Sequence, residues 1–80
     1  MENVRDIVAR NVRLARQEAG LSQEDLAEAA GIDLSYEGRI ERGTANPSVE
    51  VIAKLARVLK VRPGSLLEAG PGGRATGPKR

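Results

Sequence analysis

The stretch from residue 21 to residue 43 constrains the fold most, because helix start and stop signals follow one another there at short intervals. Ser22 is a favourable N-cap, and Asp25, three residues later, completes a variant of the capping box. Acidic side chains in the first turn also suit the positive end of the helix dipole. Gly31 supplies the left-handed residue that commonly follows the last turn of a helix. Asp33 can cap a second helix, which the glycine at the end of the stretch closes.

Helices this short are not stable alone in water, so these two must pack against each other. Leu26, Ala27 and Ala30 lie on one face of the first helix at helical spacing. The two alanines are small enough to allow a close crossing. Two short helices that cross closely after a tight turn form a helix-turn-helix, whose second helix can enter the major groove of DNA.

The other ordered segments also show helical patterns, and no stretch shows a strand pattern. Apolar residues recur at three- and four-residue steps over residues 4–19 and again over residues 49–60. Ser48 caps the latter helix after a loop that contains Pro47, and Pro63 suits the first position of a short last helix. The expected buried stripe of the 49–60 helix consists of Val49, Ile52, Ala53, Ala56 and Leu59. The sequence therefore predicts an all-α domain of five helices, over about residues 4–19, 23–30, 34–42, 49–60 and 63–68.

The end of the chain differs in composition from the predicted domain, which spans residues 1–69. Residues 70–80 are Gly, Pro, Arg and Lys with two small residues, and such a segment buries too little surface to fold. We therefore expect a flexible tail. Residues 69–80 carry three positive charges and no acid, and since the whole chain has a net charge of +2, residues 1–68 sum to −1. Any nucleic-acid footprint on the domain must be a local patch.

Missing residue types exclude several functions. The chain has no Cys and no His, which excludes a disulfide framework, a thiolate site, imidazole catalysis and metal sites with nitrogen ligands. No nucleophile–base pair accompanies the acids at the start of the second helix, so we expect no enzyme, no metal and no cofactor. The apolar runs are too short to span a membrane, and charges interrupt the N-terminus before a signal peptide can form. The cytoplasm is the expected location.

The whole motif resembles the phage-repressor (Cro-type) helix-turn-helix family. The residues that carry the resemblance are 21–27 (Leu-Ser-Gln-Glu-Asp-Leu-Ala), Gly31, 40–43 (Ile-Glu-Arg-Gly) and 46–48 (Asn-Pro-Ser). The match covers about residues 4–68. Tyr36 ahead of the Ile-Glu-Arg-Gly sequence, and an end after the fifth helix, are similar to the restriction–modification controller proteins. The resemblance implies a lambda-repressor-like DNA-binding domain.

The resemblance further implies that the helix over residues 34–42 reads base edges. Its groove-facing side matches Leu34, Ser35, Tyr36, Gly38 and Arg39, and base contacts are expected from Leu34, Ser35, Tyr36 and Arg39. An arginine can bind a guanine with two parallel hydrogen bonds, and a leucine can touch a thymine methyl. Other interpretations remain open: Tyr36 as a packing residue, Ser35 as a second cap, and Arg39 as part of a solvated face.

Phosphate contacts and an internal ion pair are implied in the same way. The residues expected to bind phosphate are Gln23, Arg42, Thr44 and Asn46. Gln23 begins a helix, where free backbone donors and its own amide can meet an anion. Arg16 and Glu41 match a salt bridge that ties the first helix to the third in the family.

Two residues depart from the family pattern. Glu37 stands where the family usually has Ile or Val packed against the second helix, so its carboxylate must reach water or a partner, or it destabilises the domain. Ala45 stands where a basic residue is common, which removes a phosphate contact. Together with Leu34, Ala45 makes the recognition face less basic than the family pattern, which affects the expected affinity for DNA but not the fold.

The predicted assembly is a symmetric homodimer. One recognition helix reads few base pairs, so two copies are expected about one DNA turn (~34 Å) apart. Spare apolar surface for this contact is expected at Val61, Leu66 and Leu67. The predicted function is a sequence-specific transcriptional regulator that binds a palindromic operator in double-stranded DNA, with no small-molecule effector. The alternative is an antitoxin, or another interaction module of a toxin–antitoxin pair, that binds DNA secondarily.

Overall fold

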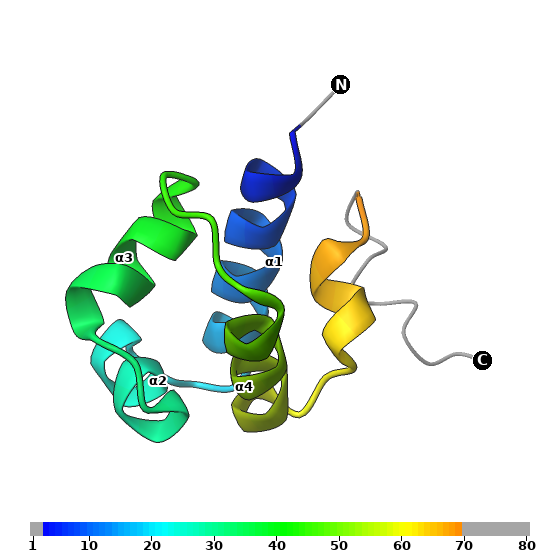
Figure 1. The fold of residues 1–80 in the computed structure, drawn as a ribbon. Helices are drawn as coiled ribbons and strands as arrows, with labels where there is room; N and C mark the ends of the chain where they lie inside the picture. The colour runs from blue at the N-terminus through cyan, green and yellow to red at the C-terminus, as the bar shows by residue number, and fades with distance from the viewer. Residues whose placement is uncertain (1–2, 70–80) are drawn as a thin grey trace.

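The structure is a computed structural model that describes residues 3–69, which form four α-helices and one 3₁₀ helix (Figure 1). They are α1 (Val4–Glu18), α2 (Gln23–Ala30), α3 (Leu34–Arg42), α4 (Val49–Leu59) and the 3₁₀ helix η1 (Pro63–Leu67). Residues 3–69 contain no β-strand, so the all-α prediction is confirmed. None of the described helices is long and apolar enough to cross a membrane. The predicted tail, residues 70–80, lies outside the described residues.

Each α-helix begins at the cap that the sequence predicts. The Ser22 hydroxyl accepts a hydrogen bond from the backbone N–H of Asp25 at 2.9 Å, and the Asp25 carboxylate accepts one from the N–H of Ser22 at 3.2 Å. These two bonds complete the capping box of α2. The caps of α1, α3 and α4 are Asn3, Asp33 and Ser48. The glycines that follow α2 and α3 both have left-handed backbone conformations, as expected for helix ends.

The helix ends differ slightly from the prediction. Ala19 and Lys60 are C-caps, so α1 and α4 each end one residue earlier than expected. The predicted fifth helix exists, but it is a five-residue 3₁₀ helix that ends at Leu67. Within η1, the backbone N–H of Ser65 donates to the carbonyl of Arg62, three residues earlier, at 3.0 Å. Short helical segments near helix termini commonly adopt this tighter form.

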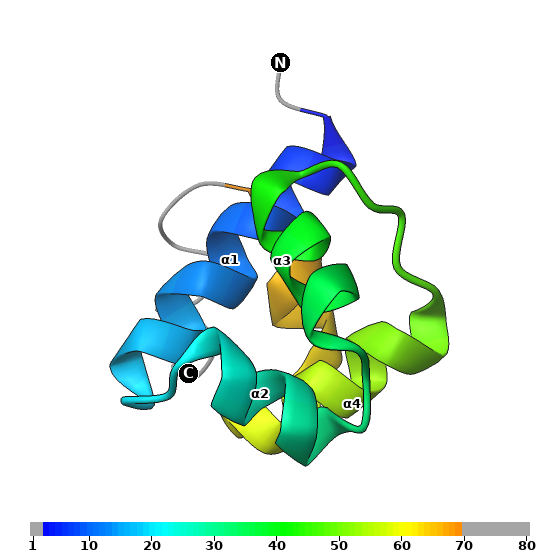
Figure 2. The same ribbon diagram turned by 90° about the vertical axis from the view of Figure 1, so that its left-hand side faces the viewer.

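Helix α1 is the central element of the packing. It contacts α3 on one side and η1 on the other (Figure 1), while α2 contacts both α3 and α4 (Figure 2). The core between these elements is aliphatic, because the chain has a single aromatic residue. Its buried members are Val8, Val12, Ala15, Leu26, Ala30, Ile40, Ala45, Ile52, Leu55, Ala56, Leu59 and Leu66.

Two apolar residues differ from the prediction in their burial: one is buried instead of exposed, and the other is exposed instead of buried. Leu66 is only 2% exposed, because η1 folds back against α1 and α4 and places this side chain in the core. It therefore cannot belong to the spare surface predicted for a dimer, whereas Leu67 is 49% exposed and Val61 is half-buried. Val49 was expected in the buried stripe of α4 but is 82% exposed, because it is the first residue of the helix and the neighbouring elements cover only later turns.

A single buried amide attaches η1 to α1. Asn11 is 1% exposed, and its Nδ2 lies within donating distance of the carbonyl oxygens of Ser65 (3.3 Å), Leu66 (3.0 Å) and Glu68 (2.9 Å). These carbonyls are at the end of η1, where a short helix leaves acceptors without internal partners. Asn11 therefore supplies a side-chain donor to the end of η1, and its own buried amide is hydrogen-bonded.

Candidate nucleic-acid interface

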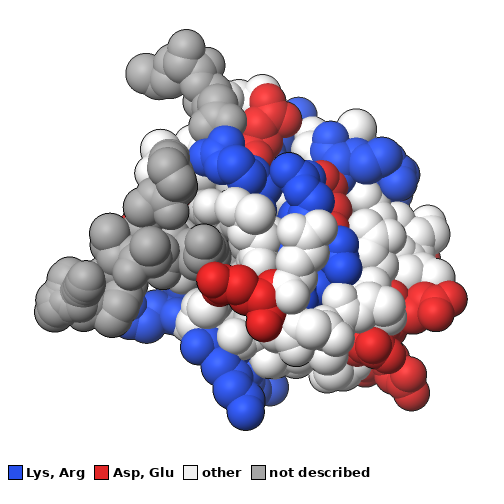
Figure 3. Space-filling model, turned by 180° about the vertical axis from the view of Figure 1, so that it is seen from behind, with Lys and Arg blue, Asp and Glu red and all other residues white. Residues whose placement is uncertain are grey.

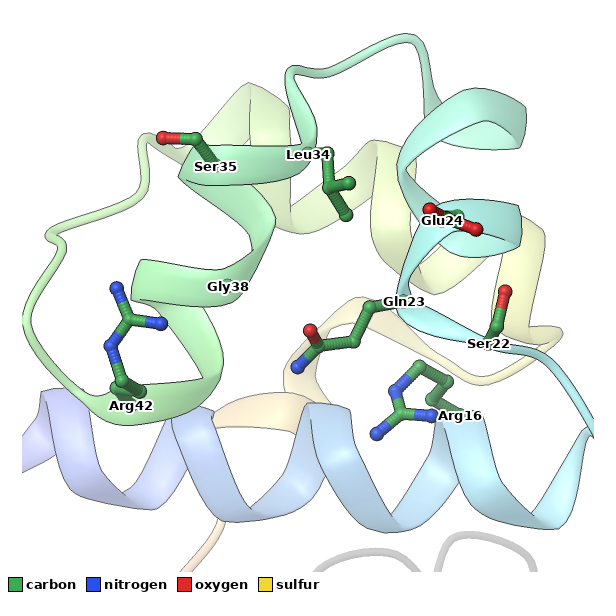
Figure 4. A pocket seen from close by; sticks show the side chains of 8 residues that line it. All are labelled: Arg16, Ser22, Gln23, Glu24, Leu34, Ser35, Gly38 and Arg42. Carbon is green, nitrogen blue, oxygen red and sulfur yellow. The ribbon is translucent and has the colours of Figure 1, made fainter.

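An open cleft of about 630 Å³ lies between the start of α2 and one face of α3 (Figure 4). The residues that line it are Arg16, Ser22, Gln23, Glu24, Leu34, Ser35, Gly38 and Arg42. Because α2 begins at Gln23, the positive end of its dipole lies at this cleft. Figure 4 shows Arg16 extending from α1 toward Gln23, with Arg42 on the other side of the cleft beside α3. Donors from three helices therefore surround one space.

The arginine expected in an ion pair forms a two-bond contact beneath this cleft. Arg16 Nε donates to Oε2 of Glu41 at 2.8 Å, and Arg16 Nη2 donates to Oε1 at 3.1 Å. Arg16 Nη1 also donates to the carbonyl of Leu21 at 2.9 Å, at the start of the loop into α2. The contact ties α1 to α3 and to that loop. Parallel bonds of this kind between a guanidinium and a carboxylate are stronger than neutral ones.

The carboxyl of Glu41 is a strong acceptor despite its burial. Burial by itself would raise its pKa, but the neighbouring Glu37 carboxyl, the hydrogen bonds from Arg16 and Gln23, and the charge of Arg16 lower the pKa below its ordinary value. The bond to Glu41 in turn raises the pKa of Arg16. The pair is therefore ionised across the physiological range.

Gln23 uses its side-chain amide inside the protein. Its Nε2 donates to Oε1 of Glu41 at 3.2 Å, which sets the direction of the amide at the start of α2. The amide nitrogen carries two N–H groups, so a second donor stays available to an acceptor in the cleft. Glu41 thus joins the ion pair to the residue expected to bind phosphate.

The face of α3 expected to read bases has three exposed side chains. Leu34 is 43% exposed, and Ser35 and Arg39 are also exposed. Tyr36 is half-buried against the core, and the Arg39 guanidinium lies 5.5 Å from the centre of its ring. That stacking holds Arg39 along the helix and leaves its N–H edges open, since a cation over a ring uses the ring face.

The structure brings some of the expected phosphate ligands together and separates others. Gln23 and Arg42 share the cleft. The Thr44 hydroxyl donates to the carbonyl of Arg39 at 3.3 Å, just past the end of α3. Asn46 is exposed but lines a different hollow, beside the starts of α1 and α4. Asn46 therefore lies apart from the Gln23 cleft.

Sequence reasoning missed the contact of one residue in this region and the reason for another. The sequence analysis gave no role to Arg13, yet its Nη1 donates to the backbone carbonyl of Glu41 at 3.2 Å. The spacing of Arg13 and Arg16, three residues apart on one helix face, is the signal that could have indicated it. Gly38 was placed in the groove, but it is buried, and a Cβ there would lie 3.3 Å from Nη1 of Arg42. Its missing side chain makes room for that guanidinium.

Glu37 lies in a position that is unfavourable for an ionised carboxylate. The residue is completely buried, and neither carboxyl oxygen accepts a hydrogen bond from any of residues 3–69. Burial, followed by the proximity of Glu41, raises the pKa of Glu37 to about 8. The carboxyl is therefore mainly protonated at neutral pH. In this neutral form it can occupy a position where the family usually has an apolar side chain.

On the face opposite to that of Figure 1, the charged side chains do not form one broad patch of a single sign. Figure 3 shows the side of the molecule opposite to that of Figure 1, where Lys and Arg side chains are interspersed with acidic ones. A mixed surface gives little long-range attraction for DNA, so binding must depend on local donors. The cleft and the exposed face of α3 supply such donors.

Comparisons with known proteins agree with this geometry. A family model described as helix-turn-helix matches residues 12–66. Control protein C.SmaI from Serratia marcescens is 37% identical over 65 residues, which are 81% of this chain and 77% of that protein. The solved structure of the hypothetical transcription factor NHTF from Neisseria is 38% identical, with a TM-score of 0.80 over 82% of this chain and 76% of its own. The restriction-modification controller protein C.AhdI from Aeromonas hydrophila is 42% identical, with a TM-score of 0.75 over 78% of this chain and 94% of its own.

The matched region contains all of α2 and α3 and the second half of α1, so it includes every residue that lines the cleft. The resemblance to controller-type regulators that the motif residues indicate is confirmed by these relatives. This chain belongs to the helix-turn-helix family of DNA-binding regulators.

Proposed function

We propose that this helix-turn-helix regulator binds a palindromic operator as a symmetric dimer, with α3 in the major groove and the start of α2 against the DNA backbone. The observation that carries the proposal is the cleft between α2 and α3. Gln23 and Arg42 line it, and the exposed side chains of Ser35 and Arg39 continue from it along α3. One rigid unit thus presents phosphate donors next to donors for base edges.

The two sets of contacts have different roles. Gln23 and Arg42 would position the protein by binding phosphates, since phosphate contacts carry no sequence information. Leu34, Ser35 and Arg39 would provide sequence preference, because their exposed side chains can reach base edges. Thr44 and Asn46 follow α3 and would contact the backbone beyond the cleft.

A set of alanine variants tests this division. The duplex probes are the sequences that the chain selects from a random library, together with single-base variants of them. We expect Arg39→Ala to weaken the free energy of operator binding by about 1–3 kcal/mol and to relax the sequence preference at one base pair per half-site. Gln23→Ala should weaken binding to all probes by a similar factor. The assignment of α3 is wrong if Arg39→Ala keeps the full preference, or if Gln23→Ala alone changes it.

The dimer contact is proposed on the surface around the end of η1 and the starts of α1 and α4. Its exposed apolar members are Val4 (53% exposed), Val49 (82%) and Leu67 (49%), beside a hollow of about 140 Å³. Half-buried Val61 extends the apolar surface at the other end of η1. Leu67→Glu should convert a dimer to a monomer in sedimentation while leaving the unfolding midpoint nearly unchanged. A wild-type chain that stays monomeric at high concentration, with and without DNA, would contradict the dimer.

The same hollow favours one second candidate, which is binding of an unlike protein, as an antitoxin does. Exposed apolar side chains around a depression are typical of protein contacts. The two candidates separate by mass: a homodimer covers this surface in the purified chain alone, whereas an unlike partner leaves the chain monomeric until the partner is added.

A further inference from the structure

The side chain of Glu37 lies beneath the recognition helix in a position without access to water. It is fully buried on the inner face of α3. Glu37 and Glu41 are four residues apart, so their side chains are neighbours on that face. Neither oxygen of Glu37 accepts a hydrogen bond from a residue in the described range. An ionised carboxylate in such a place would be strongly destabilising.

The charges around Glu37 are too few to balance two carboxylates. The elements that pack against α3 are α1 and α2. From α1, Arg16 pairs with Glu41, Arg13 bonds the Glu41 carbonyl, and Asp6 lies near the far end of α3. From α2, the group at the cluster is the neutral amide of Gln23, whereas the acids of that helix (Glu24, Asp25 and Glu28) are exposed. Arg16 is bound to the carboxylate of Glu41 and the one contact of Arg13 here is to a backbone carbonyl, so neither cation donates a hydrogen bond to the carboxyl of Glu37.

We propose that Glu37 is a protonated positioning residue, which keeps α3 and Gln23 in their DNA-binding arrangement and releases them when it ionises. The inference rests on the proposed function, because it concerns the regulation of that same interface. In the neutral form, the Glu37 O–H can donate to the carboxylate of Glu41, its neighbour one helical turn away, which is bound to Arg16 and Gln23. In the ionised form, two adjacent carboxylates compete for Arg16, and the buried charge is removed only if α3 shifts away.

The pH range over which this switch operates is set by the pKa of the Glu37 carboxyl. Burial and the neighbouring Glu41 raise the pKa of Glu37 to about 8. The chain has no His and no Cys, so the terminal amino group is the other group that ordinarily titrates near this pH. A change between about pH 7 and pH 9 that disappears when Glu37 is replaced can therefore be assigned to its carboxyl.

The first experiment observes the proton directly. A carbon-13 NMR titration of the side-chain carboxyls in the full chain should show one Glu with a midpoint near 8, and that signal should be missing in Glu37→Gln. The control Glu28→Gln, at an exposed position, should keep it. A wild-type spectrum in which every Glu titrates below about pH 6 would overturn the proposal.

The second experiment measures DNA binding against pH, using the duplexes that the wild-type chain selects from a random library at about pH 6.5. If only the protonated form binds, the affinity per bound protomer should fall about tenfold from pH 7 to pH 9. Glu37→Gln, which is neutral at every pH, should stay within about twofold of its own value, and Glu28→Gln should follow the wild type. If Glu37→Gln does not fold, Glu37→Leu serves the same purpose.

The outcomes separate the two proposals. Equal pH profiles in wild type and Glu37→Gln overturn the inference and leave the proposed function intact. If no duplex is selected, the proposed function fails. In that case the thermal midpoint of the free chain still tests the inference, because it should fall from pH 6 to pH 9 more steeply in wild type than in Glu37→Gln.

Discussion

Two buried polar junctions attach α1 to distant segments of the chain, and they use different chemistry. At the η1 junction, the neutral amide of Asn11 reaches three backbone carbonyls. At the α3 junction, Arg16 binds Glu41 with two bonds while Glu37 lies buried beside it. The first junction has the same donors and acceptors at every pH, whereas the second depends on one proton. Among residues 3–69, the buried carboxyls are those of Glu37 and Glu41, on the side of α1 that supports the proposed DNA interface.

The largest effect is expected from Arg16→Met, which leaves the buried carboxylate of Glu41 without its cation. Breaking a buried ion pair from one side typically destabilises a protein by about 3–5 kcal/mol. The free energy of unfolding in urea measures the loss. The double variant Arg16→Met/Glu41→Leu should recover part of it, because the unpaired charge is removed. If the single variant hardly moves the midpoint, the ion pair does not hold α1 to α3.

Asn11→Ala should have the next largest effect, at the neutral junction. The substitution removes the side-chain donor to the buried carbonyl of Leu66. The free energy of unfolding should fall by about 2 kcal/mol. The loss should be the same at about pH 6 and pH 8, because no titratable group takes part. A loss that changes with pH would show that the two junctions are coupled, contrary to the comparison.

The pH dependence of stability should be opposite in sign for the two carboxyls of the charged junction. The pKa of Glu37 in the folded chain is about 8, against an ordinary value of 4.5, so the folded state holds a proton that the unfolded state has released. Its contribution is complete below about pH 4.5 and is lost as the pH rises to about 8, with a slope of at most about 1.4 kcal/mol per pH unit. Glu41 has a lowered pKa, so its contribution is lost only as the pH falls through that lower value.

Urea unfolding at several pH values checks these signs. Stability should decline from about pH 5 to pH 8 in wild type and equally in Asn11→Ala, but less in Glu37→Gln. A stability that rises over this range would contradict the assignment of a buried neutral Glu37.

The smallest expected effect is that of Gly38→Ala, at the interface itself. Alanine favours a helix over glycine by about 1 kcal/mol, but the added Cβ would lie 3.3 Å from Nη1 of Arg42. That guanidinium is the far end of a flexible side chain, so it can move aside. We expect unchanged or slightly higher thermal stability and DNA binding reduced by a few-fold. A variant that binds as well as wild type would show that the position of Arg42 is unimportant.

Most of the secondary structure was predictable from the sequence because its signals are local. The capping box of Ser22 and Asp25, and the left-handed glycines after α2 and α3, act over four residues or fewer. The resemblance carried by residues 21–48 correctly indicated the family. Glu37 was recognised as a departure from that pattern, but its protonated burial could not be derived, since the charges around it belong to α1 and to the next turn of α3.

The sequence by itself therefore determined where the helices begin and where α2 and α3 end, because caps and left-handed glycines depend on neighbours along the chain. Only the tertiary structure decided that Leu66 enters the core, that Val49 stays outside it, and that Asn11 holds η1. It also decided that Gln23 is held by Glu41. Burial and hydrogen bonding of this kind depend on which distant elements meet, and a side chain carries no local signal of the partner it will find across the fold.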